Sequence, residues 1–385
     1  MTGPDEVTSP TPKSPAVQPG ISCAEFPRDM LVLLRCSHDG GELAPTAELR
    51  SGAFGVIDAQ LRCVICKTEY LIQDGIARMV VSALGAEGDH EMAIRDREYA
   101  NMPESFVAPQ FGWRSSLFDL LQVPQHLRRL EPLDGCTAVD IGSGDGRFTM
   151  LMAQLGARVL AVDFSINALR RLSSRLPSSV APTTFPLPRV VRSGDLRGQV
   201  GLAQADAGQF HLAPGSFDRA VSATPLDSRD QRMAMYRVIA DALRDDGRYL
   251  CSVEHDDLLR RLLGLPLARR YSRAGIFLEH FDADTLRREV SPYFLKLETR
   301  PIRPDVPFIS HLPFAWQVRV SLAFQTLPVL REFGEIMLLL AERPVRPPTE
   351  GLHRPGNKLA KTLFSIYSRV RHREPIVGGE HERVL

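Results

Sequence analysis

The stretch that decides the fold covers residues 137–163 and begins Thr-Ala-Val-Asp140-Ile-Gly142-Ser-Gly144-Asp-Gly146-Arg-Phe. Its first five residues are a short run rich in β-formers, which predicts a buried strand. Three glycines at alternate positions follow, and then residues 148–155 have helical composition. A second apolar run, 158–162, is closed by Asp163. The order strand, glycine-rich turn, helix, strand and acid is half of a nucleotide-binding α/β unit.

The parts of this unit each have a chemical use. Glycines let the turn bend tightly and let a ligand lie against bare backbone. Because the turn opens a helix, we expect its unpaired N–H groups and partial positive charge to face a ligand. Asp163, about 20 residues after the turn, is placed to accept from both hydroxyls of a ribose.

The spacing of the turn separates two kinds of cofactor. A dinucleotide fingerprint requires a third glycine where this chain has Arg147. Here Asp140 instead precedes the first glycine by two residues, and a carboxylate there suits a ligand with a cationic ammonium end and repels a pyrophosphate. The pattern resembles motif I of the class I methyltransferases that depend on S-adenosylmethionine (SAM).

Further motifs follow in the order of that family. Residues 202–207 predict a third strand that ends at Asp206, and runs at 216–222, 248–253, 293–302 and 334–343 predict four more. The resemblance covers about 135–255 and is closest to the branch that includes quinone-biosynthesis enzymes. It implies a Rossmann-like seven-stranded α/β sheet with helices on both faces. It also implies that the residues contacting SAM are Asp140, Gly142, Ser143, Gly144, Gly146, Asp163, Phe164, Asp206 and Ala207.

A separate small β module is predicted at residues 30–81. It contains Cys36-Ser-His-Asp39 and a second knuckle, Leu61-Arg-Cys63-Val-Ile-Cys66, followed by Tyr70-Leu-Ile-Gln-Asp-Gly-Ile. Paired short-spaced ligands of this kind point at one tetrahedral ion. The module resembles the zinc-ribbon family that activates tRNA and protein methyltransferases. Carried over by position, the ligands of one structural zinc ion are Cys36, Asp39, Cys63 and Cys66.

Asp39 departs from the family, because it stands where a fourth cysteine is usual. One alternative is that the fold persists without a metal. Another is that the adjacent His38 is the fourth ligand, although its spacing from Cys36 is cramped.

Changes in composition and in the hydrophobic pattern divide the rest of the chain into segments. The proline-rich residues 1–20 predict a disordered tail, 82–132 a helical connector, and 133–343 the methyltransferase domain. In the connector, Tyr99, Phe111 and Trp113 face either the cofactor pocket or the core. A helical insertion near 304–333 is either a substrate lid, a cover for the sheet or a dimer contact. Beyond it lie a linker and a basic amphipathic tail, 344–385, which suggests peripheral membrane contact, a partner or packing on its own domain.

The balance of charge bears on function. Lys+Arg number 47 against 46 Asp+Glu in 385 residues, so no basic surplus favours a nucleic-acid partner. No apolar run is long enough to span a membrane, no secretory signal is apparent, and six cysteines are too few for a disulfide scaffold, so a cytoplasmic protein is expected.

The expected function is transfer of a methyl group from SAM to oxygen or carbon of a small molecule. The segment after the fourth strand is Ser222-Ala-Thr-Pro-Leu, not the Asn-Pro-Pro-Tyr type associated with amino-group methylation. His255 and His280 are candidate bases, and neither is assigned. The alternatives are an rRNA or tRNA methyltransferase and a non-catalytic scaffold with the same fold.

Overall fold

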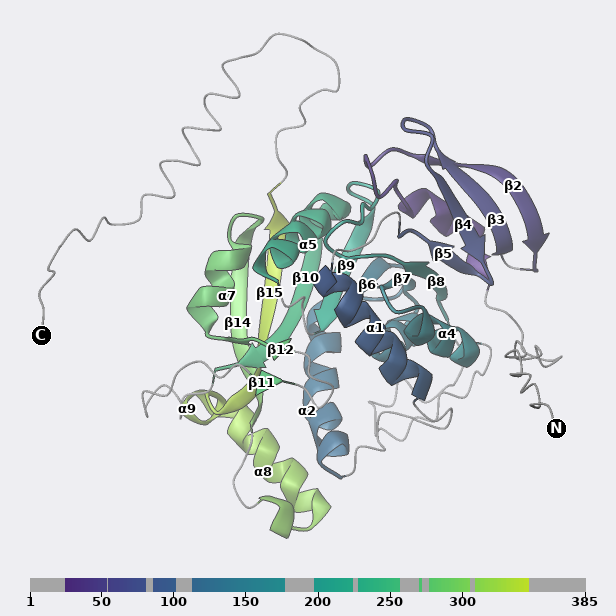
Figure 1. Cartoon of the computed structure of the whole chain (residues 1–385). Helices are drawn as coiled ribbons and strands as arrows, with labels where there is room; N and C mark the ends of the chain where they lie inside the picture. The colour runs from purple at the N-terminus through teal and green to yellow at the C-terminus, as the bar shows by residue number, and fades with distance from the viewer. Residues whose placement is uncertain are drawn as a thin grey trace, which may run out of the picture. The chain divides into compact units, whose positions relative to one another are not determined.

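The computed structural model describes residues 25–53, 55–80, 86–101, 113–176, 197–223, 228–256, 270–271, 277–304 and 309–345, and the structural statements below concern these residues (Figure 1). The predicted tail at 1–20, Phe111 and residues 346–385 of the predicted linker and amphipathic tail lie outside them.

Most of the described strands join one 13-stranded sheet. Seven of these strands form its central and C-terminal part, in the order β8-β7-β6-β9-β10-β15-β14. They are β6 (Thr137–Ile141), β7 (Arg158–Asp163), β8 (Gln199–Gln204), β9 (Phe217–Ala223), β10 (Leu243–His255), β14 (Phe294–Pro304) and β15 (Gly334–Pro344).

The direction of these strands confirms the predicted α/β fold class. β8, β7, β6, β9 and β10 pair in parallel, whereas β15 is antiparallel to both β10 and β14. The chain first builds outward from β6 to β8 and then returns to add β9 on the other side of β6. Parallel sheets bind ligands at the carboxyl ends of strands beside such a reversal.

Two strands differ clearly from their predicted limits. β10 covers Leu243–His255 rather than 248–253, so it begins five residues earlier and ends two residues later. β8 covers Gln199–Gln204 rather than 202–207, so Asp206 lies in the turn that follows the strand. The neighbouring strand β7 ends at Asp163, which pairs with Gln204. β8 therefore ends at Gln204, because β7 has no later residue with which it could pair.

Helices cover both faces of the sheet. An apolar cluster on one face includes side chains of α5 (Arg229–Ala242) and α7 (Ala283–Val290). The cluster on the other face includes side chains of α2 (Trp113–Leu130), α3 (Arg147–Gln154) and α4 (Ile166–Arg175). α2 is the C-terminal part of the predicted helical connector, 82–132, and it contains Pro124.

The N-terminal strands extend the same sheet. They are β1 (Phe26–Pro27), β2 (Leu43–Ser51), β3 (Gly55–Cys63), β4 (Glu69–Gln73) and β5 (Ile76–Arg78), with a 3-10 helix, η1 (Arg28–Leu33), between the first two. β5 pairs in parallel with β8, and Ile76, Ala77 and Arg78 face Leu202, Ala203 and Gln204 in register. The apolar cluster that contains α5 and α7 also includes side chains of η1, β3 and β4, so the N-terminal strands share a core with the larger part of the sheet.

Three more α-helices, three two-residue strands and a 3-10 helix occupy other described segments. They are α1 (Ala86–Asn101), β11 (Arg270–Tyr271), β12 (Phe277–Leu278), β13 (His280–Phe281), a 3-10 helix at Ile309–His311, α8 (Phe314–Thr326) and α9 (Pro328–Arg331). The predicted helical insertion near 304–333 thus contains α8 and α9. No helix in the described ranges has both the length and the hydropathy needed to cross a membrane.

Candidate functional site

The carboxyl ends of three neighbouring parallel strands bring the predicted cofactor residues to one edge of the sheet. The glycine bend, residues 142–146, follows β6; Asp163 ends β7; and Asp206 lies just after β8. In the order β8-β7-β6, the strand that ends at Asp163 lies directly beside the strand that leads into the bend. The strand that precedes Asp206 is the next one along the sheet. The fold alone therefore assembles these distant parts of the sequence.

The bend has the backbone conformation that its glycines allow. Gly142, Gly144 and Gly146 all have positive φ, at 72°, 55° and 92°. A Cβ added at Gly142 would meet no atom within 4 Å, which leaves open space beside this peptide. At Gly146 a Cβ would lie 2.3 Å from Leu172 Cδ1, because α4 packs closely on the bend. The bend therefore needs glycine for conformation throughout and for close packing at its third position.

The expectation that the amides of this bend are free for a ligand is wrong for four of them. The N–H groups of Gly142 and Ser143 donate to the Val162 carbonyl at 2.8 and 3.1 Å, and the N–H of Gly146 donates to the Ser143 carbonyl. The Gly144 N–H donates to Asp163 Oδ2 at 2.8 Å. These amides anchor the bend to β7 and close it on itself, so polar contacts to a ligand must come chiefly from side chains.

Asp163 is held rigidly in this arrangement. Its Oδ2 accepts from Gly144, and its Oδ1 accepts from the Ser165 N–H at 2.8 Å. A carboxylate oxygen can accept more than one hydrogen bond, so these two amides do not prevent Asp163 from accepting a hydroxyl as well. Two backbone amides thus orient an acceptor that fits a pair of vicinal hydroxyl groups.

Asp206 has an unsatisfied oxygen. Its Oδ1 accepts from the Gly208 N–H at 2.9 Å, while Oδ2 is buried and has no hydrogen-bond partner among the described residues. Burial raises the pKa of this carboxyl, and the Gly208 N–H opposes the shift. A buried acceptor with no donor costs free energy, so the site is suited to a ligand that donates an N–H there. Ser143 Oγ is likewise buried and unpartnered.

The other predicted cofactor residues lie around these groups. Phe164 is half-buried directly after β7, and its carbonyl accepts from Gln204 Nε2 at 3.0 Å. Ala207 is buried beside Asp206. Asp140 is buried within β6 and accepts from the Thr149 hydroxyl at 2.6 Å.

Helix α1 contacts the bend, which agrees with one of the two alternatives given above for Tyr99. Asp96 Oδ1 accepts from the Ser165 hydroxyl at 2.5 Å and from the Asn167 N–H at 3.2 Å, which ties α1 to the start of α4. The Tyr99 hydroxyl lies 2.6 Å from the position that a Gly144 Cβ would occupy. Tyr99 was one of three aromatic candidates for the pocket; Asp96 was not considered, because a charged helical stretch carries no local sign of a long-range contact.

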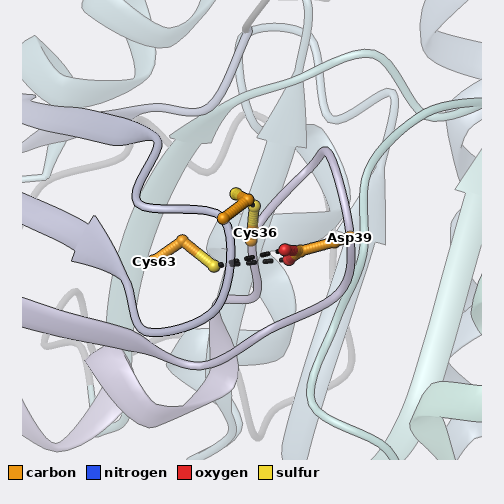
Figure 2. Close-up of side chains that lie close together, drawn as sticks. Cys36, Asp39 and Cys63 are labelled. Carbon is orange, nitrogen blue, oxygen red and sulfur yellow. Dashed lines mark hydrogen bonds between the residues drawn. The ribbon is translucent and has the colours of Figure 1, made fainter.

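The predicted metal ligands form a second cluster. One donor atom from each of Cys36, Asp39, Cys63 and Cys66 lies within 4.8 Å of all the others. Cys36 Sγ and Cys66 Sγ are 3.5 Å apart, close to the roughly 3.8 Å between two sulfurs on one tetrahedral zinc. Cys63 Sγ is 3.3 Å from Asp39 Oδ1, and Figure 2 shows the carboxylate pointing at this thiol.

Backbone amides support the sulfurs of this cluster. The His38 N–H donates to Cys36 Sγ at 3.4 Å, and the Ile65 N–H donates to Cys63 Sγ at 3.3 Å. The Gly41 N–H holds Asp39 in place and keeps its pKa well below the usual range. The hydrogen bond from Thr68 lowers the pKa of Cys66, whereas burial raises that of Cys36 to about 11. His38 is exposed and not among the four clustered residues.

Comparison with known proteins bears on the larger of the two sites. Residues 139–251 match the family model described as a methyltransferase domain. This part of the chain is a methyltransferase domain. The match begins within β6 and ends within β10, so it includes the bend and both carboxylates at the edge of the sheet. A search of curated proteins found no match.

Solved structures are similar to the chain at low identity. An S-adenosylmethionine-dependent methyltransferase from Mesorhizobium loti is 19% identical, with a TM-score of 0.37, over 57% of this chain and 96% of that one. Phosphoethanolamine N-methyltransferase 1 from Haemonchus contortus is 13% identical, with a TM-score of 0.45, over 75% of this chain and 55% of that one. A chain from the complex between the Haloferax volcanii Trm112 methyltransferase activator and a methyltransferase is 15% identical, with a TM-score of 0.41, over 65% and 98%.

Two histidines lie near the end of β10, beyond the residues that match the family model. His255 ends this strand, and His280 lies in β13, which pairs in parallel with it. Both are buried. The His255 Nδ1–H donates to the Gly334 carbonyl at 2.6 Å, which leaves Nε2 as the basic nitrogen of the neutral ring.

The buried Asp140 makes the stability of the domain depend on pH. Burial raises its pKa from 3.8 to about 6, against the opposing hydrogen bonds from Thr149, and the nearby Asp163 adds to the rise. A carboxyl whose pKa is higher in the folded state stabilises the fold fully below its unfolded pKa and loses this contribution as pH rises through the folded value. Asp140→Asn should therefore be more stable than the wild type at pH 8, by up to about 3 kcal/mol, with the difference vanishing near pH 4.

Urea unfolding of the ligand-free protein at pH 4, 6 and 8 measures this difference. The exposed Asp246 of β10 provides a control, because Asp246→Asn removes the same charge without changing a buried site. A difference between Asp140→Asn and the wild type that stays constant with pH would contradict the assignment.

Proposed function

We propose that the chain is a SAM-dependent methyltransferase that methylates oxygen or carbon of a small-molecule acceptor. The observation that carries the proposal is the buried, unpartnered Oδ2 of Asp206, at the same sheet edge as the rigidly held Asp163 carboxylate. An adenosine needs an acceptor for its amino group and another for its ribose hydroxyls, and these two side chains have that chemistry.

The residues present fit this cofactor. Asp163 would accept from the ribose hydroxyls, and Asp206 Oδ2 would accept from the adenine amino group. Phe164 would offer an apolar face to the ring, and the open side of Gly142 leaves room for the ligand backbone to approach. Asp140 places negative charge beneath the bend, which favours a ligand carrying an ammonium group. When bound, SAM supplies a methyl group on a sulfonium that leaves readily, so the protein is chiefly required to position the acceptor and exclude water.

The choice of acceptor rests on sequence chemistry. The formal net charge is +1, which gives no electrostatic footprint for RNA. The segment after β9 lacks the Asn-Pro-Pro-Tyr type of sequence, which lowers the case for amino-group acceptors. A small molecule with an oxygen or carbon nucleophile is the remaining class.

Transfer of tritium from methyl-labelled SAM into a host-cell extract tests the proposal. We expect label that resists RNase and protease and is recovered in the small-molecule or solvent-extracted fraction. RNase-sensitive label would identify an RNA methyltransferase instead. Bound SAM without any transfer would identify a non-catalytic scaffold.

We further propose that Cys36, Asp39, Cys63 and Cys66 hold one structural zinc ion. The support is the convergence of three thiols and a carboxylate, with backbone N–H groups directed at two of the sulfurs. The chemistry matches a four-coordinate site, in which a carboxylate is an accepted ligand. The metal would cross-link the loop before β2 to the turn after β3.

Metal analysis of the purified protein tests this site. We expect about one zinc ion per chain, and we expect a strong chelator to remove it and lower the melting temperature by several degrees. Cys63→Ser should lose the metal, and Asp39→Cys should retain it. Cys136→Ser is the matched control, because Cys136 lies outside the cluster and is partly exposed. Equal zinc content in Cys63→Ser and Cys136→Ser would contradict the proposal.

A further inference from the structure

Helix α8 buries polar side chains and exposes apolar ones, which is the reverse of the usual arrangement for a surface helix. Gln317, Ser321 and Gln325, one turn apart, are buried, and Gln325 Nε2 approaches the Leu121 carbonyl of α2 at 3.5 Å. Large apolar side chains of the same helix are exposed instead, and Trp316 is 55% exposed. A helix of a water-soluble domain normally buries its apolar stripe, so the arrangement indicates that the outer face of α8 meets an apolar environment.

The exposed apolar side chains continue from α8 into the flanking segments. We call them the α8–α9 face, and they are Leu312, Phe314, Trp316, Leu322, Leu327 and Val329. Several large apolar side chains exposed within one short segment indicate an interaction site on a soluble protein. Residues 309–331 contain two arginines and no aspartate or glutamate.

A cavity of about 520 Å³ opens between α8 and α2 beside this face. Leu121, Phe314, Val318 and Leu322 contribute an apolar lining, and the guanidinium groups of Arg128 and Arg319 also border the cavity. Neither arginine has an ion-pair partner in the part of the chain that the structure describes. Arg319 lies over the Trp316 ring, 5.4 Å from its centre. The charge of this region is complementary to an anion that carries an apolar chain.

We propose that the α8–α9 face docks the protein on the surface of an anionic lipid bilayer. Apolar side chains with Trp and Arg beside them suit the boundary between acyl chains and headgroups. A second copy of the chain suits the face less well: Arg331 pairs with Glu332 at 3.9 Å, but a twofold contact through the face would bring the two copies of Arg319 together without an acid from α8 to neutralise them.

The connectivity of the sheet relates this face to the cofactor edge. β14 and β10 are both antiparallel to β15, so they are parallel to each other. The segment that carries α8 and α9 leaves the carboxyl end of β14, which is therefore the sheet edge that also carries the bend and Asp163. Docking through this segment would turn that edge toward the bilayer. The proposal for the α8–α9 face does not depend on which ligand binds at the cofactor edge.

Fluorescence of Trp316 in the full chain tests the proposal. The chain has two tryptophans, so Trp113→Phe leaves Trp316 as the single reporter. Vesicles that contain phosphatidylglycerol should shift its emission to the blue, and lipids brominated on the acyl chain should quench it. Binding should be at least about tenfold weaker with pure phosphatidylcholine and should weaken with salt.

Variants locate the contact. Leu322→Ser combined with Val329→Ser should reduce binding at least about tenfold, since each removes an apolar side chain from the bilayer. Leu295→Ser is the matched control: Leu295 is 74% exposed, lies on β14 outside the face, and should leave binding unchanged. Arg128→Gln with Arg319→Gln should reduce the preference for anionic lipid. Sedimentation of wild-type protein with the same vesicles checks that Trp113→Phe behaves normally.

Three results would overturn the proposal. One is the absence of binding to either kind of vesicle. Another is binding without quenching of Trp316, which would assign the contact to another segment such as the basic tail. The third is a concentration-dependent dimer, without vesicles, that Leu322→Ser disrupts; the face would then join two copies of the chain.

Discussion

Asp163→Ala should weaken SAM binding by at least about 100-fold, the largest functional effect we expect from one substitution. The carboxylate would accept from two ribose hydroxyls, and each hydrogen bond to a charged group contributes about 1.5–3 kcal/mol. Its geometry is set in advance by the amides of Gly144 and Ser165, at 2.8 Å each, so little ordering is required on binding. Equilibrium dialysis with radiolabelled SAM measures the affinity.

Asp218 supplies the matched control for this experiment. β7 and β9 flank β6 on its two sides, and Asp218 lies at the amino end of β9, the edge opposite to Asp163. Its carboxylate also accepts a backbone amide, from Thr137 at 2.8 Å. Asp218→Ala should therefore cost stability without changing SAM affinity. Equal losses of affinity in the two variants would show that the effect is structural.

Gly146→Ala should reduce the free energy of unfolding by about 2–5 kcal/mol, the largest stability effect we expect. Two penalties combine there: a non-glycine residue at a φ of 92° costs roughly 1–2 kcal/mol, and forcing a methyl group against Leu172 costs a further 1–3 kcal/mol or so. Chemical denaturation at neutral pH measures the loss.

Gly135→Ala separates the two penalties. Gly135 also has a positive φ, 74°, but a Cβ there would meet nothing within 4 Å. It should cost only the conformational part, about 1–2 kcal/mol. Leu172→Ala added to Gly146→Ala should cost less than the two single losses combined, because the shortened side chain relieves the contact. Equal losses for the two glycine variants would contradict close packing of α4 on the bend.

Local sequence patterns predicted the sheet well. The strand at 137–141 was predicted with the boundaries that β6 has, and that at 334–343 differs from β15 by one residue. Both are predominantly apolar runs that end at a glycine or a charged residue, which is the pattern expected of buried strands. The boundary of β8 was displaced because it is set by where the partner strand β7 ends, and not by the residues of β8 alone.

Long-range contacts were harder to predict. Nothing in residues 76–78 indicates that β5 pairs with β8, where Ile76 lies opposite Leu202, although β5 belongs to the module that was predicted from its cysteine spacing. Contacts between near neighbours in the chain follow from local chemistry: Ser165, of a residue type favoured at the N-cap, accepts from the Ala168 N–H at the start of α4. The link from Asp96 to that same serine was missed, because it joins two helices through a residue type common on any solvated surface.

The candidate site shows the same division. The acids were predicted from their places at strand ends, and the structure brings Asp163 and Asp206 to one edge. A glycine pattern does not predict that the amides of the bend donate hydrogen bonds to β7 and to Asp163. The pattern shows which backbone conformation is allowed, but it does not specify the hydrogen-bond partners. The buried polar stripe of α8 was missed as well, since its apolar residues at helical spacing predict an apolar buried face.

The central claim is that Asp163 and Asp206, at the carboxyl ends of adjacent strands, form the two anchoring points of an adenosyl sulfonium site. Isothermal titration of the wild-type protein with SAM tests it most directly. We expect one site per chain that is saturable and that weakens markedly in Asp206→Ala. A flat titration with correctly folded protein, or unchanged binding after that substitution, would contradict the account.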